Sequence, residues 1–145
     1  MEKDDEKYMK MALQEAEVAA EKDEVPVGAV VVCNGRVIAR AHNLTETLND
    51  VTAHAEMQVI TMAANYLGGK YLNKCAIYVT VEPCPMCATA LAWAQVGEVI
   101  YGTPDKKRGY SLFSPSLLHP KTVVRSGVLE TESADIISKF FKNKR

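Results

Sequence analysis

The sequence lacks long hydrophobic runs and carries almost no net charge. No stretch approaches the about 20 consecutive apolar residues that a transmembrane helix needs, and the opening MEKDDEKYMK lacks the apolar core of a secretory signal. The formal net charge is −1 and the pI is near 6.3, so the molecule as a whole has no field that attracts nucleic acid. We therefore predict a cytoplasmic protein with no membrane partner, in which any nucleic-acid partner is held by a local basic patch.

Cysteine is also scarce, with four residues in a chain of 145. The chain is larger than the usual disulfide-stapled mini-domain, and two of the cysteines form a C-x-x-C pair, which is typical of metal or redox sites. We therefore predict that all four are reduced. The hydrophobic fraction of 48% is enough for a globular core, and no linker, repeat or low-complexity segment interrupts the chain. Residues 1–145 are predicted to form one domain.

Helix and strand signals alternate along the chain. The spacing of apolar residues predicts helices at about 5–21, 52–66, 83–96 and from about 131 onward. Apolar, β-branched runs predict two strands flanking Asn34-Gly35, which is a strong hairpin signal, and further strands at 75–81, 98–102 and 121–129. The segment 102–120 is loop-rich with at most one short helix. Strands that alternate with helices need crossover connections, so the predicted fold class is α/β, a three-layer α/β/α arrangement with a mixed, partly parallel sheet.

The helix predicted at 52–66 begins in an unusual way. The stretch TAHAEMQVI places His54 and Glu56 two residues apart, about 200° around an ideal helix, so they cannot share a side face but can both bend round the helix end. The stretch PCPMC places Cys84 and Cys87 on one face at the start of the next helix. If the two helix N-termini point at one spot, a zinc ion could take one imidazole and two thiolates, the ligand set of an open catalytic site.

The residue types at this site also predict its chemistry. The positive ends of two helices favour the thiolate forms of the cysteines and lower their pKa values. Two thiolates cancel the charge of Zn²⁺, which leaves the metal a weaker Lewis acid that benefits from a nearby base. Glu56 is the carboxylate in place to take a proton from water and hand it to a leaving group.

Other readings of these residues remain open. A structural zinc closed by a fourth cysteine is one, but Cys75 precedes Cys84 by nine residues, or ~30 Å of extended chain, and is expected at the far end of its strand. Cys33 is expected to be a small core residue. His42 and His119 are predicted not to be ligands. A nucleic-acid-binding module that keeps the zinc without catalysis is a further alternative, against which the acid beside the open position argues.

Several sequence blocks resemble a known family. The HAE and PCPMC stretches match the H-x-E…P-C-x-x-C signature of zinc nucleobase deaminases. The closer resemblance is to the bacterial tRNA-specific adenosine deaminases, and it is carried in order by EVPVGAVVV, TAHAEMQ, YVTVEPCPMC, YGTPDKKRGY and GVLETESADIISKFFKNKR. The resemblance implies a cytidine-deaminase-like fold, a homodimer, and conversion of adenosine to inosine at the first anticodon position of a tRNA.

The resemblance also implies roles for individual residues. It assigns one zinc ion per chain to His54, Cys84 and Cys87, and the proton shuttle to Glu56. The positions implied to contact the flipped base or the tRNA anticodon stem-loop are Asn43, the backbone of Ala55, Asp105, Lys107, Lys142, Lys144 and Arg145. The apolar run CATALAWAQVGEVIYG gives weak support for the homodimer, although Trp93 and its neighbours could equally lie in the core.

The sequence departs from the family pattern in places. Val51 stands where a proline is usual, Pro85 stands where a valine is common, and the segment 102–127 is several residues shorter than in well-known members. CPMC is also typical of free-base and nucleoside deaminases, so a deaminase of guanine, cytosine or cytidine is the alternative function. Such an enzyme needs its pocket closed over a small ligand, often by a C-terminal segment, and here that segment ends in positive charge. The sequence therefore favours tRNA.

Overall fold

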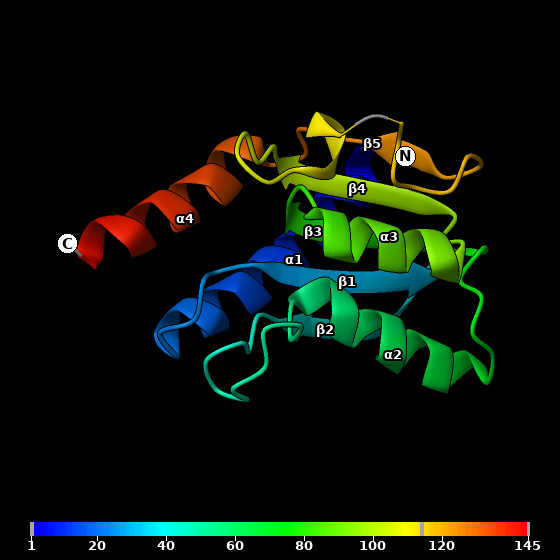
Figure 1. Ribbon diagram of the computed structural model, residues 1–145, viewed down its shortest axis with the longest axis horizontal. Helices are drawn as coiled ribbons and strands as arrows, with labels where there is room; N and C mark the ends of the chain where they lie inside the picture. The colour runs from blue at the N-terminus through cyan, green and yellow to red at the C-terminus, as the bar shows by residue number, and fades with distance from the viewer. Residues whose placement is uncertain (1, 114, 145) are drawn as a thin grey trace.

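The computed structural model describes residues 2–113 and 115–144 and shows a five-stranded sheet between two layers of helices (Figure 1). In chain order the elements are α1 (Glu2–Glu21), β1 (Gly28–Cys33), β2 (Arg36–His42), α2 (Ala55–Leu67), β3 (Cys75–Val81), α3 (Pro85–Ala94), β4 (Glu98–Thr103), the 3₁₀ helix η1 (Tyr110–Leu112), β5 (Val123–Arg125) and α4 (Glu130–Asn143). Among these described residues, none of the helices has the length and apolar character needed to cross a membrane.

The sheet is mixed, as the sequence predicts. Its strand order is β2-β1-β3-β4-β5, in which β1 is antiparallel to both of its neighbours while β3, β4 and β5 are parallel. The predicted hairpin between β1 and β2 is confirmed. It turns at Asn34 and Gly35, whose φ angles of 53° and 74° are those that a tight hairpin turn requires.

Each face of the sheet packs against its own pair of helices. Alternate residues of β1 point to opposite faces, so Val31 joins the apolar cluster under α2 and α3 while Val30 joins the cluster that includes Met9 and Ala12 of α1. The helix α4 packs on β4 and touches α1. Figure 1 shows α2 and α3 on the viewer's side of the sheet and α1 behind it. The predicted three-layer α/β/α class is therefore confirmed.

Several element boundaries differ from the predicted ones. The helix α2 begins at Ala55 rather than near residue 52, because the side chain of Asp50 accepts bonds of 2.8 and 2.7 Å from the backbone N–H and hydroxyl of Thr52 and holds a turn there. The strand β5 covers only 123–125 of the predicted 121–129, because the chain turns at Gly127 with a φ of 79°. Trp93, for which a core position was the alternative to an interface, is 83% exposed.

An ion-pair network around the buried Asp5 ties the first helix to β3, β4 and β5. Asp5, 2% exposed, accepts a 2.7 Å bond from the Tyr78 hydroxyl and bonds of 2.8 and 2.9 Å from the Arg125 guanidinium, which also donates to Glu98 at 2.6 Å. Burial raises the pKa of Asp5, but the bonds from Arg125 and Tyr78 outweigh burial and hold the pKa below the ordinary 3.8. The carboxylate is therefore charged at neutral pH and links α1, β3 and β5.

We expect Asp5→Asn to lower the free energy of unfolding near pH 7 by about 2–3 kcal/mol, because an amide cannot accept all three bonds. The folded-state pKa of Asp5 is lowered, so the stabilisation is full above the unfolded value of 3.8 and is lost as the pH falls through the folded value. Urea unfolding of both proteins should therefore show a gap that shrinks between about pH 5 and pH 2. A gap that stays constant over this range would contradict the ionised pair.

Candidate metal centre and substrate pocket

Three metal-binding side chains converge where α2 and α3 begin. His54 is the N-cap residue of α2 and Cys84 is that of α3, yet neither side chain caps its own helix. The Sγ atoms of Cys84 and Cys87 lie 3.7 and 3.4 Å from the His54 Nδ1 instead. All three donor atoms lie within 4.8 Å of one another, so the two helix N-termini meet at one spot as predicted.

The spacing of these donors fits a zinc ion. A nitrogen and a sulfur bound to one tetrahedral zinc lie about 3.6 Å apart, and the two nitrogen–sulfur distances here fall on either side of that value. Within residues 2–113 and 115–144, the group of possible metal donors contains these three residues and no fourth. Cys75 lies at the opposite end of β3 from Cys84, which agrees with the prediction that it is not a fourth ligand.

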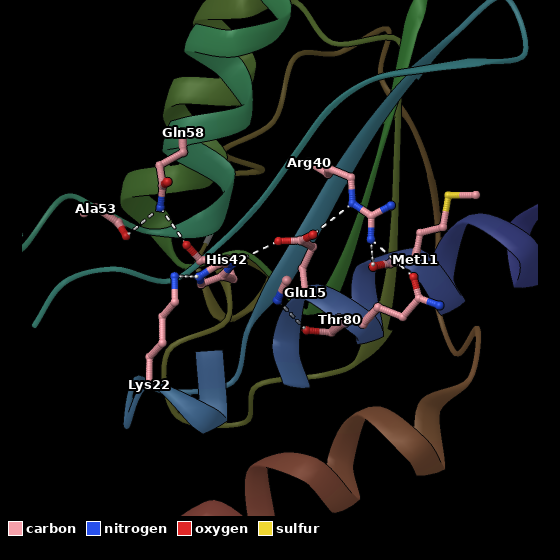
Figure 2. A network of polar contacts seen from close by, with 10 residues as sticks. Met11, Glu15, Lys22, Arg40, His42, Ala53, Gln58 and Thr80 are labelled. Carbon is pink, nitrogen blue, oxygen red and sulfur yellow. Dashed lines mark hydrogen bonds and ion pairs between the residues drawn. The ribbon is translucent and has the colours of Figure 1, made fainter. Parts of the chain in front are cut away.

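The other cysteines and histidines lie apart from this group, as predicted. All four cysteines are free thiols. Cys33 is half-buried and packs against the core beneath α2 and α3. The His42 ring lies between the Lys22 ammonium, at 3.1 Å, and the Glu15 carboxylate, at 2.9 Å (Figure 2). His119 accepts a 3.1 Å bond from the backbone N–H of Lys121.

Hydrogen bonds within the metal group shift the pKa values of the two cysteine thiols in opposite directions. The Cys87 thiol and then the His54 ring bond to the sulfur of Cys84, and together they lower the pKa of Cys84 to about 4. The same contact with Cys84, with burial, raises the pKa of Cys87. The bond to Cys84 raises the pKa of His54. The lowered pKa of Cys84 favours the thiolate, the form in which cysteine binds a metal.

Glu56 lies beside this group with an unsatisfied oxygen. Its side chain belongs to the first turn of α2 and is 3% exposed, and burial raises its pKa to about 7. Among the described residues, its Oε1 has no hydrogen-bond partner. A buried oxygen without a partner is costly, and such atoms in native proteins call for a reason. A carboxyl group that titrates near neutrality and faces a pocket can both take up and release a proton.

A cavity of about 230 Å³ opens over the metal group. Asn43, Ala55 and Asp105, all predicted to contact substrate, line it together with His54 and Glu56. Arg108, a cation of the loop after YGT where the sequence favours RNA contacts, lines it too, whereas sequence analysis missed five further lining residues, which are Val25, Val27, Thr45, Val81 and Glu82. The apolar ones looked like ordinary strand residues, and the polar ones like solvated loop.

Gln58 connects the two segments that bring Asn43 and His54 to the cavity. Its side-chain amide donates to the backbone carbonyls of His42, at 2.7 Å, and Ala53, at 3.2 Å (Figure 2). These two residues directly precede Asn43 and His54. One side chain on α2 therefore fixes the end of β2 relative to the first metal-binding residue.

A wider groove of about 850 Å³ continues from the cavity between the 103–108 loop and α4. Apolar residues that include Val81, Ile137 and the half-exposed Phe141 line it, with four cations, which are Lys106, Lys107, Arg108 and Lys144. Val25, Val27, Val81, Asp105 and Arg108 belong to both hollows, so the two are continuous. The groove thus joins the metal group to a local basic patch on a chain of almost no net charge.

Only some of the lysines predicted to contact RNA line the groove. Lys107 and Lys144 line the groove, whereas Lys142 is exposed on α4 outside the set of lining residues. Arg145 lies outside the residues that the structure describes. The Lys144 ammonium forms an ion pair with Asp23. Because exposed ion pairs contribute little, a phosphate can compete for this lysine.

Two carboxylates shape the basic loop of the groove. Asp105 Oδ1 accepts 3.0 Å bonds from the backbone N–H groups of Lys107 and Arg108, so the residue builds the turn as well as lining the cavity. Glu82, 3% exposed, accepts 3.0 Å bonds from the backbone N–H groups of Asp105 and Ser111. Glu82, the residue that directly follows β3, therefore holds the loop at both ends.

Comparison with known proteins identifies close relatives. The sequence matches the MafB19-like deaminase family over residues 3–145. It is 49% identical over 143 residues to the tRNA-specific adenosine deaminase of Agrobacterium fabrum (strain C58), covering 95% of this chain and 94% of that protein. It is 48% identical over 146 residues to the tRNA-specific adenosine deaminase of Bacillus subtilis (strain 168), covering 97% of this chain and 91% of that protein.

A solved structure agrees with these matches. It comes from a study of A-to-I editing by tRNA:A34 deaminases at the wobble position of transfer RNA. It overlaps this chain with a TM-score of 0.84 at 48% identity, covering 89% of this chain and 97% of that one. This overlap confirms the predicted fold.

Proposed function

This chain belongs to the family of tRNA-specific adenosine deaminases, and from that premise we propose that it hydrolyses adenosine to inosine at the first anticodon position of a tRNA. The observation that carries the proposal is the continuity of the two hollows: the cavity over His54, Cys84 and Cys87 opens into a groove lined by four cations. A base that is swung out of an RNA loop can enter the cavity while its phosphates lie in the groove.

The proposed chemistry assigns a role to each residue around the cavity. His54, Cys84 and Cys87 would hold one zinc ion per chain, which supplies Lewis acidity toward water. Glu56 takes a proton from the attacking water and delivers it toward the amino group at C6 of adenine, which leaves as ammonia. Asn43 and the backbone N–H of Ala55 orient the base. Water and adenosine thus give inosine and ammonia with the proton carried by one side chain.

The proposed RNA contact is local rather than a property of the whole molecule. Lys107 and Lys144 in the groove, Asp105 at its junction with the cavity, and Lys142 and Arg145 toward the chain end supply the contacts that the family resemblance implies. Lysine and arginine at such a groove bind the backbone phosphates, which set affinity more than sequence preference. A tRNA substrate also supports the proposal of a cytoplasmic protein in which residues 1–145 act as one deaminase domain.

We also propose that the protein forms a homodimer through the outer face of α2 and α3. Trp93 on α3 is 83% exposed and lines a shallow hollow with Tyr71, which is 50% exposed. Met62 and Tyr66 on α2 are exposed as well. Large aromatic and Met side chains gathered on a surface are typical of interfaces, because isolated monomers rarely leave them in water.

The metal proposal predicts that purified protein contains one zinc per chain and that His54→Ala, Cys84→Ala and Cys87→Ala each lose it. Glu56→Gln should behave differently, because Glu56 lies outside the donor set: zinc stays, while turnover falls by at least the ~10²–10⁴-fold assigned to a general acid–base group. Elemental analysis and circular dichroism of each variant provide the check. Protein without zinc, or a fourth protein ligand seen by X-ray absorption, would overturn the metal site.

The substrate proposal predicts that an arginine-tRNA anticodon stem-loop with adenosine at the wobble position is converted to inosine. Free adenosine, guanine, cytosine and cytidine should react far more slowly, because they gain nothing from the groove. Neutralising Lys142, Lys144 and Arg145 together should abolish stem-loop turnover at low substrate concentration. Ammonia release and nucleoside analysis measure both outcomes.

The control for the Lys142, Lys144 and Arg145 variant is a protein in which Lys70, Lys74 and Lys121 are neutralised instead. These exposed lysines lie beside the amino ends of β3 and β5, away from the metal group, so the variant loses the same charge without touching the groove. It should keep stem-loop turnover near that of the unmodified protein. Rapid turnover of a free base with an inert stem-loop would instead show that the protein is a free-base deaminase with the same metal chemistry.

The dimer proposal predicts that Trp93→Glu sediments as a monomer at micromolar concentration, where the unmodified protein sediments as a dimer. A charge at a buried interface centre is strongly unfavourable, whereas the same charge on an exposed helix is tolerated. Val18→Glu on α1, which covers the opposite face of the sheet, is the matched control and should remain a dimer. A monomeric unmodified protein would rule the interface out.

A further inference from the structure

A buried acid outside the proposed chemistry holds one wall of the cavity. Glu24 follows α1, is fully buried, and accepts three hydrogen bonds from a single loop. The bonds come from the backbone N–H of Glu46 at 3.1 Å, and from the backbone N–H and the hydroxyl of Thr47, both at 2.6 Å. The carboxylate thus joins the end of the first helix to a loop 22 and 23 residues further along the chain.

This carboxylate is balanced by dipoles rather than by a cation. Within the described part of the chain, Glu24 takes part in none of the ion pairs. Burial raises its pKa, but the bonds from Thr47 and Glu46 outweigh burial and lower it, so the group is an anion at neutral pH. A buried anion is costly unless its hydrogen bonds are complete. The three donors of the 46–47 segment are therefore tightly specified in position.

The loop that Glu24 holds is part of the cavity. Asn43 and Thr45 line the cavity at its start, and the Asn43 amide donates to the Thr45 hydroxyl at 3.5 Å. The backbone closes the loop where Leu44 N–H bonds to Ala53 C=O at 3.0 Å. On the other side, the residues that follow Glu24 include Val25 and Val27, which line the same cavity.

Apolar packing does little to fix the middle of this loop. Leu48 and Val51 are 55% and 84% exposed, so the loop buries no large apolar side chain there. Asp50 and Thr52 hold the later turn beside α2, and Gln58 holds the two ends. The backbone N–H of Asn43 bonds to the carbonyl of Val27 at 3.1 Å, and the bonds to Glu24 hold the segment beyond it, at Glu46 and Thr47.

We propose that Glu24 is a positioning residue whose carboxylate fixes the 43–47 segment against the Val25–Val27 segment and so sets Asn43 and Thr45 where the target base must enter. This inference rests on the proposed function, because it takes the nucleobase to be the ligand of the cavity. Glu24 itself touches neither the metal donors nor the base. It acts on recognition and leaves the metal group unchanged.

The variant that tests the proposal is Glu24→Gln, which keeps the shape of the side chain. The amide has one acceptor oxygen and a donor group, so at least one N–H or O–H of Glu46 and Thr47 loses its partner. We expect a rise in KM for the stem-loop of roughly tenfold or more, with a much smaller change in kcat, and one zinc per chain as before. Thr47→Val, which removes only the hydroxyl bond, should give a smaller rise in KM. Thr47→Ser keeps the hydroxyl and should have the KM of the unmodified protein.

Asp5→Asn is the matched control, because it removes the charge of another buried carboxylate whose partners lie away from the cavity. It should lower stability without a change in KM. A second readout is independent of activity: in metal-loaded protein without substrate, the amides of Glu46 and Thr47 should exchange with solvent faster in Glu24→Gln and not in Asp5→Asn.

These measurements separate failure of this inference from failure of the proposed function. Unchanged exchange of the two amides in Glu24→Gln would overturn the positioning role whatever the substrate is. Equal rises in KM for Glu24→Gln and Asp5→Asn would overturn it too, since both would then reflect general destabilisation. An inert stem-loop with faster exchange would instead reject the tRNA substrate while keeping the loop anchor, and KM would then be compared on the free base that is turned over.

Discussion

The whole site depends on the shared direction of three strands. Because β1 is antiparallel to both β2 and β3, and β3 is parallel to β4, the strands β2, β3 and β4 all point the same way. The helices that follow β2 and β3 must run back along the sheet, so α2 and α3 both begin at its carboxyl edge. Their positive ends then lie together, where they favour thiolates and where the cavity forms. No single contact of the site would exist without this constraint.

The N-termini of α2 and α3 lack the side-chain caps that would stabilise these helices locally. An N-cap side chain that bonds its own helix is typically worth ~1 kcal/mol, and neither His54 nor Cys84 makes that bond. Glu56 adds a buried oxygen without a partner within the described chain. Sequences usually satisfy such local rules, so violations gathered at one point indicate a site selected for something other than folding. The remote network of Asp5, Tyr78 and Arg125 is fully bonded by contrast.

Sequence was a good guide wherever the signal is local. Helical spacing, the Asn34-Gly35 turn and the H-x-E and C-x-x-C spacings predict the layers, the hairpin and the metal group, because each lies within a few residues. The start of α2 was missed because the Asp50 side chain competes for the turn. Glu24 and Glu82 were missed because their partners lie 22 to 29 residues away, and an isolated acid in a sequence looks like a solvated one.

These long-range bonds divide the molecule into a rigid part and an adjustable part. The metal donors lie at the starts of helices that the sheet fixes, whereas several of the residues proposed to contact base and phosphate, such as Asn43 and Lys107, lie on two loops. A buried carboxylate helps to hold each loop, Glu24 for the 43–47 segment and Glu82 for the 105–111 segment. These bonds come mainly from backbone N–H groups and do not involve the exposed side chains of the loop. Residues such as Lys107 can therefore be substituted without disturbing the metal-binding residues. Substrate choice and metal chemistry are thereby separable within one chain.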